Sequence, residues 1–437
     1  MTKRRIAASI SLSLCFVVVY GWCNAFTAGR SDVGTFYFEW ERFIPLIPVF
    51  IIPYMSIDLF FVAAPFLCKS KKELNVFVIR ILLSICIAAY FFLILPLRFG
   101  FTRPQVEGLF GAVFRLLHGF DQPYNLFPSL HIILRTILAD VYSRHTRGAL
   151  NVVVRVWFSL IGLSTLFTFQ HHVSDVIGGF VVAFGIMYAV PYVKEKTQME
   201  ANPRIGFYFA GMSSVCLILS ILYQPLSLLF LWPAISCFII ALGYWQFGPA
   251  IFRKINGEIA WSARFILFPY FLGQAMYLKS YCRRCNRWDE IIPNLLIGRK
   301  LSVYEAEEAI AQGVVAVLDL TAEFDEAKPF RDVHYLNVQT MDLTAPTIDN
   351  LERAIVFIGK HIEEGKVYVH CKIGYSRSVA VVAAFLIKSN QAQSIEVAIA
   401  IIRKKRPTIV VRPEVMGILI SFSQAKGFRH KAKSIKE

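Results

Sequence analysis

The residues with the most specific chemistry lie in one run, residues 367–378, which reads Val-Tyr-Val-His-Cys-Lys-Ile-Gly-Tyr-Ser-Arg-Ser. Its β-branched start predicts a strand, and the apolar residues 379–387 that follow predict a helix, so a loop joins the two. Such a loop can turn successive N–H groups toward an anion at the helix N-terminus, and Gly374 allows the tight curvature. The same dipoles would stabilise a Cys371 thiolate, while Arg377 could hold two phosphate oxygens. The run therefore predicts a cysteine nucleophile in a phosphate-binding loop.

A second set of residues combines histidine with a carboxylate and an arginine. His131 follows Pro-Ser-Leu at the start of one apolar stretch, and His171 precedes another, four residues before Asp175. Residues four apart share a face of a helix, so the carboxylate can hold the imidazole in one tautomer. One histidine could attack phosphorus while the other protonates the leaving oxygen, and Arg98 or Arg103 could neutralise the phosphate oxygens. The set predicts phosphoryl transfer, although interfacial histidines that anchor helix ends would give the same motifs.

Composition places these groups in a membrane protein. Of 437 residues, 56% are hydrophobic and 17% are charged, and the mean hydropathy is +0.53, whereas soluble domains carry about 25% charged residues. A wholly soluble, disordered or collagen-like chain is excluded. The net charge of +16 could suit nucleic acid, but basic loops mark the cytoplasmic segments of multispanning proteins, so we expect no nucleic-acid partner. The nine cysteines show no regular pairing and predict no disulfide framework.

Long apolar stretches predict about eight membrane-spanning helices in an all-α membrane domain. They lie near residues 6–23, 44–67, 75–97, 129–142, 151–169, 173–192, 206–222 and 226–245. Lysine and arginine gather at the N-terminus and after every second stretch, and the pair after the sixth is Lys194 and Lys196. Because such loops favour the cytoplasm, we expect an integral multi-pass protein of a bacterial inner (plasma) membrane. The N-terminus and the C-terminal domain would be cytoplasmic, and the histidines would face the outer side.

Three segments follow from this pattern. We expect a multispanning membrane domain over residues 1–250, a juxtamembrane linker over 251–288, and a cytoplasmic α/β domain over 289–437. Within the linker, residues 261–279 are expected along the membrane surface. A single Cys-x2-Cys at 282–285 offers too few ligands for a metal, so no metal site and no cofactor are expected. The basic run 403–406 indicates a solvated helix end or a segment attracted to anionic lipid.

The pattern His-Cys-x5-Arg-Ser resembles the signature of the cysteine-dependent protein tyrosine and dual-specificity phosphatases, over about residues 290–425. The resemblance implies that Cys371 is the nucleophile. It also implies that Asp342, 29 positions earlier, is the general acid, ahead of Asp319 and Asp325 as alternatives. The residues implied in binding the substrate phosphate, besides Arg377, are Lys372, Ile373, Gly374, Tyr375, Ser376 and Ser378, the last also stabilising the thiolate as leaving group.

Residues from about 80 to 192 resemble the type 2 phosphatidic acid phosphatase superfamily, whose motifs end in Arg-Pro, Pro-Ser-x-His and His-x3-Asp. The core of the membrane domain is therefore expected over this range. The resemblance implies that His171 forms a phosphohistidine, that Asp175 orients it, that His131 is the general acid and that Arg103 binds phosphate.

The membrane motifs depart from the family pattern in their cations. Pro96 stands where a lysine is expected, and Thr165 stands where an arginine is expected. With Leu130 at its third position, the motif Pro-Ser-Leu-His resembles that of the sphingolipid synthase branch. Three alternatives follow for the membrane half: a second phosphatase site, a lipid phosphotransferase, or a non-catalytic anchor or sensor.

The catalytic loop around Cys371, with residues 409–413, resembles mitochondrial dual-specificity phosphatases that hydrolyse phosphatidylglycerophosphate. We expect a membrane-bound phosphatase acting on phosphomonoesters, with a phospholipid as substrate and a phosphoprotein as the main alternative. Membrane lipids are the expected partners, and the sequence leaves the oligomeric state open.

Overall fold

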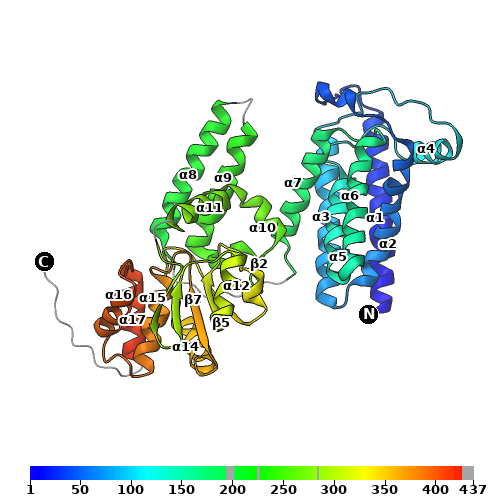
Figure 1. Ribbon diagram of the computed structural model, residues 1–437. Coiled ribbons are helices and arrows are strands. Elements are labelled where there is room, and N and C mark those ends of the chain that lie inside the picture. The colour runs from blue at the N-terminus through cyan, green and yellow to red at the C-terminus, as the bar shows by residue number, and fades with distance from the viewer. Residues whose placement is uncertain (193–200, 224–226, 283–284, 426–437) are drawn as a thin grey trace. The chain divides into compact units, whose positions relative to one another are not determined.

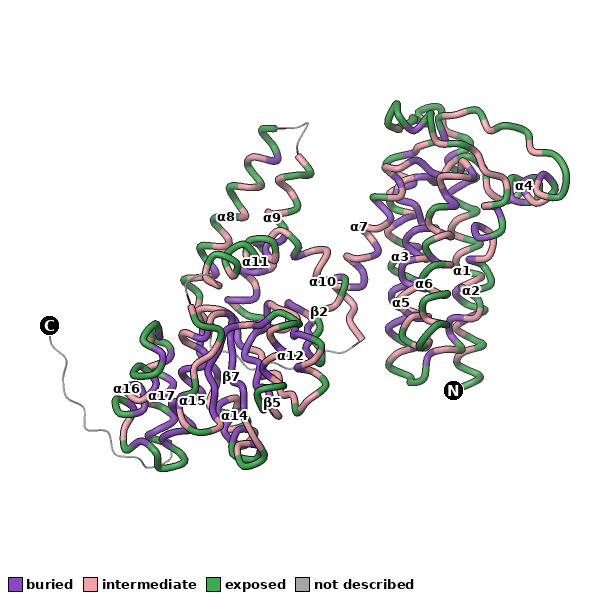
Figure 2. The backbone as a smooth tube through the Cα atoms, viewed as in Figure 1, coloured by how far each residue is buried: buried purple, intermediate pink, exposed green. Residues whose placement is uncertain are grey.

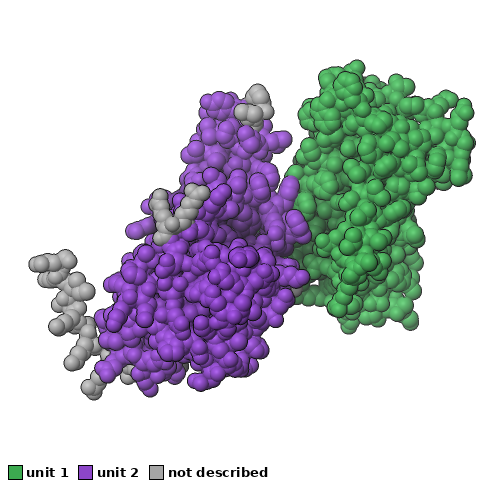
Figure 3. Space-filling view, viewed as in Figure 1, with its two compact units in different colours: residues 1–193 green, residues 194–437 purple. Residues whose placement is uncertain are grey.

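The computed structural model describes residues 1–192, 201–223, 227–282 and 285–425. Residues 1–193 and 194–437 form two compact units (Figure 3), and each is described by itself. Two features expected from the sequence fall outside the described residues. They are the basic pair Lys194 and Lys196 and the two middle residues, 283–284, of the Cys-x2-Cys motif.

The first unit is a bundle of helices (Figure 1). α5 packs against α2, α6 and α7, and α1 packs against α2 and α3. The short helix α4, in the loop that follows α3, was not predicted from the sequence. The helices are α1 (Thr2–Ala28), α2 (Ile51–Leu67), α3 (Lys71–Ile94), α4 (Gly108–Phe120), α5 (Leu130–His145), α6 (Gly148–Phe167) and α7 (Val173–Ala189), with short 3-10 helices η1 (Glu39–Phe43) and η2 (Pro48–Phe50).

Large apolar side chains point outward as well as inward in this unit. Phe77 and Ile133 are fully buried, whereas Leu59 and Val152 are 72% and 61% exposed. Exposed apolar surface on this scale fits hydrocarbon better than water.

Six helices of the described chain are long and apolar enough to cross a membrane, as expected of a membrane protein. All eight predicted stretches are helical, but α5 and α7, with 16 and 17 residues, are shorter than these six. The six are Thr2–Ala28, Pro48–Leu67, Lys71–Ile94, Gly148–Phe167, Pro203–Leu222 and Ser227–Phe252.

The second unit begins with an apolar helical hairpin, in which α8 (Pro203–Leu222) packs along α9 (Ser227–Leu242). A short connecting region then leads into the α/β domain. It consists of the π-helical turn η4 (Gly243–Phe247), the 3-10 helix η5 (Gly248–Phe252), the strands β1 (Lys254–Ile255) and β2 (Glu258–Ile259), and the helices α10 (Trp261–Ile266) and α11 (Phe268–Cys282).

A five-stranded sheet forms the centre of the α/β domain, with strand order β3-β4-β7-β5-β6. β3 and β4 are antiparallel, and β4, β7, β5 and β6 run parallel to their neighbours, so the carboxyl ends of β5, β6 and β7 share one edge. The strands are β3 (Trp288–Ile292), β4 (Leu295–Gly298), β5 (Val314–Thr321), β6 (His334–Thr340) and β7 (Lys366–His370).

Helices cover both faces of this sheet, and the strands β5 and β7 are largely buried (Figure 2). The fully buried run Val379–Ala384 of α15 packs on one face, together with α14, α16 and α17. α12 and α13 pack on the other face, around Phe330 and Tyr368. The helices are α12 (Val303–Ala311), α13 (Lys328–Arg331), α14 (Ile348–His361), α15 (Arg377–Lys388), α16 (Ile395–Lys405) and α17 (Pro413–Ala425).

The boundary between the compact units differs from the one expected at residue 250. It falls at residues 193 and 194, so the hairpin α8–α9 and the segment 251–288 belong with the α/β domain. The reason is a shared apolar core, in which Tyr244, Phe252 and Tyr270 pack with Ala322 after β5 and Met341 after β6. The described residues of the segment 251–288 therefore form folded elements.

Candidate active site

The catalytic loop, residues 371–376, lies between the end of β7 and the start of α15. Gly374 has a φ of +73°, and a Cβ atom there would lie 2.5 Å from the carbonyl oxygen of Gly298. Only glycine fits this position, since the backbone is left-handed and the space is closed. The sequence pattern of strand, loop and helix is thus found in the structure.

Cys371 is buried at the entrance of this loop. The Ser378 hydroxyl donates a hydrogen bond to Cys371 Sγ at 3.2 Å. Burial alone would raise the pKa of the thiol, but the Arg377 guanidinium, the Ser378 hydroxyl and the N–H of Gly374 stabilise the thiolate and bring the pKa below its ordinary value. Cys371 is therefore arranged as a nucleophile.

Arg377 begins α15 and is buried, with its guanidinium directed to the carboxyl ends of β5 and β6. It donates to both carboxylate oxygens of Glu323, at 3.1 and 2.7 Å, to the carbonyl of Thr340 at 2.7 Å, and to Asp342 Oδ1 at 3.3 Å. This bidentate pair holds the guanidinium in one orientation. Glu323 was not predicted, although its position just after β5 places it beside β7 in a parallel sheet.

Asp342 follows β6 and lies at the same edge of the sheet. Its Oδ2 accepts a hydrogen bond from Lys372 Nζ at 2.9 Å. Burial alone would raise its pKa, but Arg377 and Lys372 favour the carboxylate and hold the pKa below its ordinary value. The structure thus brings Cys371, Arg377, Lys372 and Asp342 together, as the sequence predicted.

The two alternative acids are engaged elsewhere. Asp319 is buried against Lys254, with Nζ and Oδ2 2.6 Å apart. Asp325 pairs with Arg264 at 2.8 Å and accepts a hydrogen bond from the N–H of Ile259. Their roles are consistent with structural anchoring of the segment before the α/β domain.

Arg406 donates hydrogen bonds to carbonyls of the catalytic loop, which was not expected for the last residue of a basic run. The basic run 403–406 was expected to be solvated or to face lipid, and residues 403–405 are exposed, but Arg406 is buried. Its guanidinium donates to the carbonyls of Gly374 at 3.1 Å and Ile373 at 3.0 Å, and it pairs with Asp289. Sequence composition gives no sign of this role, because it depends on how α16 packs against β3.

Two of the remaining residues of the predicted phosphate site, Lys372 and Tyr375, contact α11. Lys372 Nζ donates to Gln274 Oε1 of α11 at 2.7 Å, a partner the sequence did not indicate. Tyr375 is half-buried beside Tyr281, with ring centroids 6.4 Å apart. The Ser376 hydroxyl is buried and has no hydrogen-bond partner among the described residues.

In the first unit, the two predicted histidines line one cavity of about 550 Å³. His131 stands in the first turn of α5, and its ring stacks on Tyr54 with centroids 4.3 Å apart. His171 Nδ1 lies 3.6 Å from Asp175 Oδ2. His131 Nε2 and His171 Nδ1 are buried without a hydrogen-bond partner among the described residues. Arg103 donates from Nε to the carbonyl of Phe169 at 3.0 Å, two residues before His171.

Several groups around this cavity were missed by the sequence reasoning. Glu41 accepts hydrogen bonds from the N–H of Val173 and pairs with His172, so it fixes the start of α7. Asp58 and Asp121 line the cavity, whereas none of the described residues lining it is lysine or arginine. Arg103 is not part of this lining, but its charge interacts with Asp121, Tyr54 and Tyr20 of the wall.

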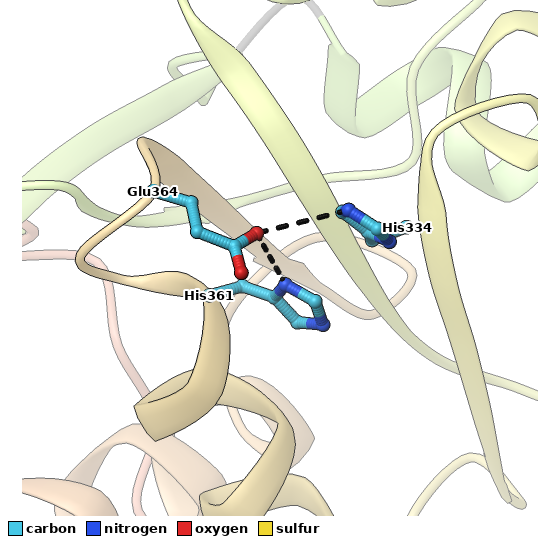
Figure 4. A group of neighbouring side chains, drawn as sticks. All are labelled: His334, His361 and Glu364. Atoms are coloured by element: carbon cyan, nitrogen blue, oxygen red, sulfur yellow. Dashed lines mark hydrogen bonds and ion pairs between the residues drawn. The ribbon is translucent and has the colours of Figure 1, made fainter.

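Two groups of side chains outside the catalytic pocket bring three potential metal ligands together. His334, His361 and Glu364 form one of them (Figure 4), with His361 Nδ1 2.8 Å and His334 Nε2 3.7 Å from Glu364 Oε2. This group lies where β6 and β7 begin, at the edge of the sheet opposite the catalytic loop. The other consists of Asp319, Glu326 and His370, which are all buried, and His370 ends β7 just before the catalytic loop.

The sheet, the loop and the grouping of Cys371, Asp342 and Arg377 define a cysteine-dependent phosphatase. Comparisons with known proteins agree. The family described as "Dual specificity phosphatase, catalytic domain" matches residues 296–425, and the family described as "PAP2 superfamily" matches residues 54–189. The chain therefore belongs to the dual-specificity phosphatase family and carries a PAP2 superfamily domain before it. It is a phosphoric monoester hydrolase of the protein tyrosine phosphatase class.

Individual relatives match the C-terminal part. "Phosphatidylglycerophosphatase and protein-tyrosine phosphatase 1" of Homo sapiens is 33% identical over 173 residues, which are 37% of this chain and 85% of that protein. "Dual specificity protein phosphatase 12" of Mus musculus is 32% identical over 161 residues, or 34% of this chain and 47% of that protein, so less than half of it is spanned. A crystal structure of PTPMT1 in complex with PI(5)P matches 32% of this chain and 96% of its own, with 28% identity and a TM-score of 0.30.

Proposed function

We propose that the chain is a membrane-bound phosphatase that hydrolyses lipid phosphomonoesters through a Cys371 thiophosphate. One observation carries the proposal: the catalytic pocket and the apolar hairpin α8–α9 belong to one compact unit. Tyr244, in the turn that ends the hairpin, donates a hydrogen bond to the carbonyl of Asp342 at 2.8 Å. A pocket joined in this way to membrane-spanning helices stays at the bilayer surface, where lipid headgroups are presented.

The reaction proceeds in two displacements at phosphorus. The N–H groups of the loop and Arg377 bind the phosphate oxygens, and Cys371 Sγ forms a bond to phosphorus as the bond to the leaving alkoxide breaks. Asp342, as a carboxylic acid, gives its proton to that alkoxide. As a carboxylate it then takes a proton from water, whose oxygen attacks phosphorus and displaces Cys371 as a thiolate stabilised by Ser378.

The low pKa of Asp342 in the free protein is compatible with this role. Its carboxylate is held by Arg377 and Lys372 when no substrate is present. A bound phosphate dianion competes for both cations and adds a negative charge beside the carboxylate. Both effects raise the pKa of Asp342 and favour the protonated form that the first step requires.

A lipid is preferred over a phosphoprotein as substrate for two reasons. The hairpin α8–α9 keeps the pocket close to lipid headgroups, and Lys372 adds a cation at its mouth. The human relative named above carries both activities in its name, so a phosphotyrosine protein is the alternative substrate. We further propose a bacterial inner membrane with the N-terminus and the phosphatase domain on the cytoplasmic side, on the basis of the loop charges.

The test is phosphate release by full-length protein in lipid nanodiscs. Phosphatidylglycerophosphate, phosphatidic acid and a phosphotyrosine peptide are compared for the wild type, Cys371→Ser and His171→Ala. Release from a lipid that Cys371→Ser abolishes supports the proposal. Release from the peptide alone would replace the lipid substrate with a phosphoprotein.

The membrane cavity supports a second candidate function, a histidine-based reaction on a lipid. Its basis is that His131 and His171 line one cavity, where His131 Nε2 has no hydrogen-bond partner among the described residues and His171 Nδ1 lies 3.6 Å from Asp175 Oδ2. Because Asp58 and Asp121 share the wall, a phosphodiester with one negative charge fits better there than a dianionic phosphomonoester. This favours the lipid phosphotransferase alternative over a second phosphatase, and transfer of a labelled headgroup to an acceptor alcohol, lost in His171→Ala, would test it.

A further inference from the structure

Helix α11 contacts the catalytic loop. Gln274 Oε1 accepts the hydrogen bond from Lys372 Nζ at 2.7 Å, and the same ammonium lies 3.9 Å from the centre of the Tyr277 ring. One turn further on, Tyr281 meets Tyr375 of the catalytic loop. Two residues of the loop are thus held by one face of α11.

The opposite face of α11 is apolar and exposed. Phe268, Leu272 and Met276 are 49%, 50% and 67% exposed, and their spacing of four residues places them in one stripe along the helix. Tyr270, on the inner face, is buried. A stripe of large apolar side chains beside an active site is costly in water, so it indicates a surface covered by an apolar partner.

The bilayer is the candidate for that partner, because α11 begins beside the hairpin α8–α9, whose helices are long and apolar enough to cross a membrane. Trp232 of α9 donates from Nε1 to the carbonyls of Phe265 and Ile266 at 3.1 and 3.2 Å, and its ring stacks on Phe268 with centroids 5.5 Å apart. Trp232 lies ten residues before the end of α9, which is roughly 15 Å along the helix. The point where α10 meets α11 therefore lies alongside α9, well away from its C-terminal end (Figure 1).

We propose that α11 is an interfacial helix whose outer stripe of Phe268, Leu272 and Met276 lies in the bilayer while its inner face holds Lys372 at the catalytic pocket. Lipid phosphate then enters the pocket along α11 directly from the membrane surface. This inference deepens the proposed function and rests on it, since a soluble phosphoprotein would have no need of such a path. It also gives the segment expected along the membrane surface, residues 261–279, a part in the active site.

A kinetic experiment tests the outer stripe. The double variant Leu272→Asp and Met276→Asp is compared with Val356→Asp, which changes a valine on α14 that is 71% exposed. Rates are measured on phosphatidylglycerophosphate in vesicles and on p-nitrophenyl phosphate in solution, with full-length protein. The ratio of lipid to soluble kcat/KM should fall about tenfold or more in the double variant, since two apolar side chains no longer enter lipid. It should not change in Val356→Asp, and an unchanged ratio in the double variant would overturn the proposal.

A second experiment does not depend on activity. A photoreactive benzoylphenylalanine replaces Met276 in one sample and Val356 in another, and irradiated nanodiscs are searched by mass spectrometry for lipid adducts. Adducts at position 276 and none at position 356 support the interfacial helix, whereas none at 276 would refute it. If the wild type released phosphate only from peptides, the proposed substrate would fail, yet the adducts would still decide where α11 lies.

Discussion

Replacing Lys254 with methionine should destabilise the phosphatase unit, although the residue lies more than a hundred positions before Cys371. Its side chain and that of Asp319 are both 0% exposed, and Nζ lies 2.6 Å from Oδ2. Nζ also donates to the carbonyl and the hydroxyl of Thr321. Breaking a buried ion pair by removing one partner costs about 3–5 kcal/mol, because the other charge is left without compensation.

The lower end of this range is expected here. Asp319 keeps hydrogen bonds from the N–H and hydroxyl of Thr321 and from the hydroxyl of Tyr335. A loss of about 3 kcal/mol in a unit of this size lowers Tm by about 6–12 °C. Thermal inactivation of p-nitrophenyl phosphate hydrolysis by full-length protein measures this, since it follows the phosphatase unit alone.

Two further variants make the reasoning refutable. Glu258 lies in the same β1–β2 hairpin as Lys254, and its exposed carboxylate pairs with Arg331. Exposed pairs of this kind contribute about 0–1 kcal/mol to stability, so Glu258→Gln should change Tm little. Asp319→Asn combined with Lys254→Met removes the isolated charge and should recover much of the lost stability. A Tm shift in Lys254→Met no larger than in Glu258→Gln, or a double variant as unstable as the single one, would contradict a buried pair that joins this segment to the phosphatase.

Three other variants test the catalytic pocket. Arg406→Met should lower kcat/KM about tenfold or more on lipid and soluble substrates alike, because two charge-assisted hydrogen bonds to the loop carbonyls are lost; a change on only one substrate would count against this support role. Glu323→Gln should weaken the hydrogen bonds that orient Arg377. The inhibition constant of inorganic phosphate, measured by competition with substrate, should then rise about tenfold or more. Lys372→Met should raise the pKa of Asp342. Since the acid form is required, the high-pH limb of kcat/KM should then move to higher pH, and a limb that stayed or moved lower would argue against Asp342 as the acid.

The catalytic loop could be predicted from the sequence because its conformation depends on residues that are neighbours in the chain. A strand, a glycine that must be left-handed and a helix N-terminus follow one another between residues 366 and 388, so Cys371 and Arg377 are positioned by neighbours in the chain. The membrane helices were predictable for a similar reason, since hydropathy over about twenty residues decides them. The shorter α4, in a loop of mixed composition, gave no comparable signal.

Residues that act on the loop from a distance could not be predicted. Glu323, Arg406 and Gln274 reach it only through the order of the strands and the packing of α16 and α11. The segment 251–288 resembled a linker in composition, because its buried Lys254 and Tyr270 carry no motif. Sequence motifs therefore identified the residues proposed to react with phosphate. The residues that position them, such as Glu323 and Arg406, could be identified only from the fold.

The most direct test of the account is the site of phosphorylation during turnover. Full-length protein in vesicles is mixed with phosphatidylglycerophosphate, quenched within milliseconds, and its peptides are mapped by mass spectrometry under conditions that preserve both thiophosphate and phosphohistidine. The account predicts phosphate on Cys371, at a level that declines as lipid is exhausted and absent in Cys371→Ser. Phosphate on His171 alone, with turnover intact in Cys371→Ser, would contradict it.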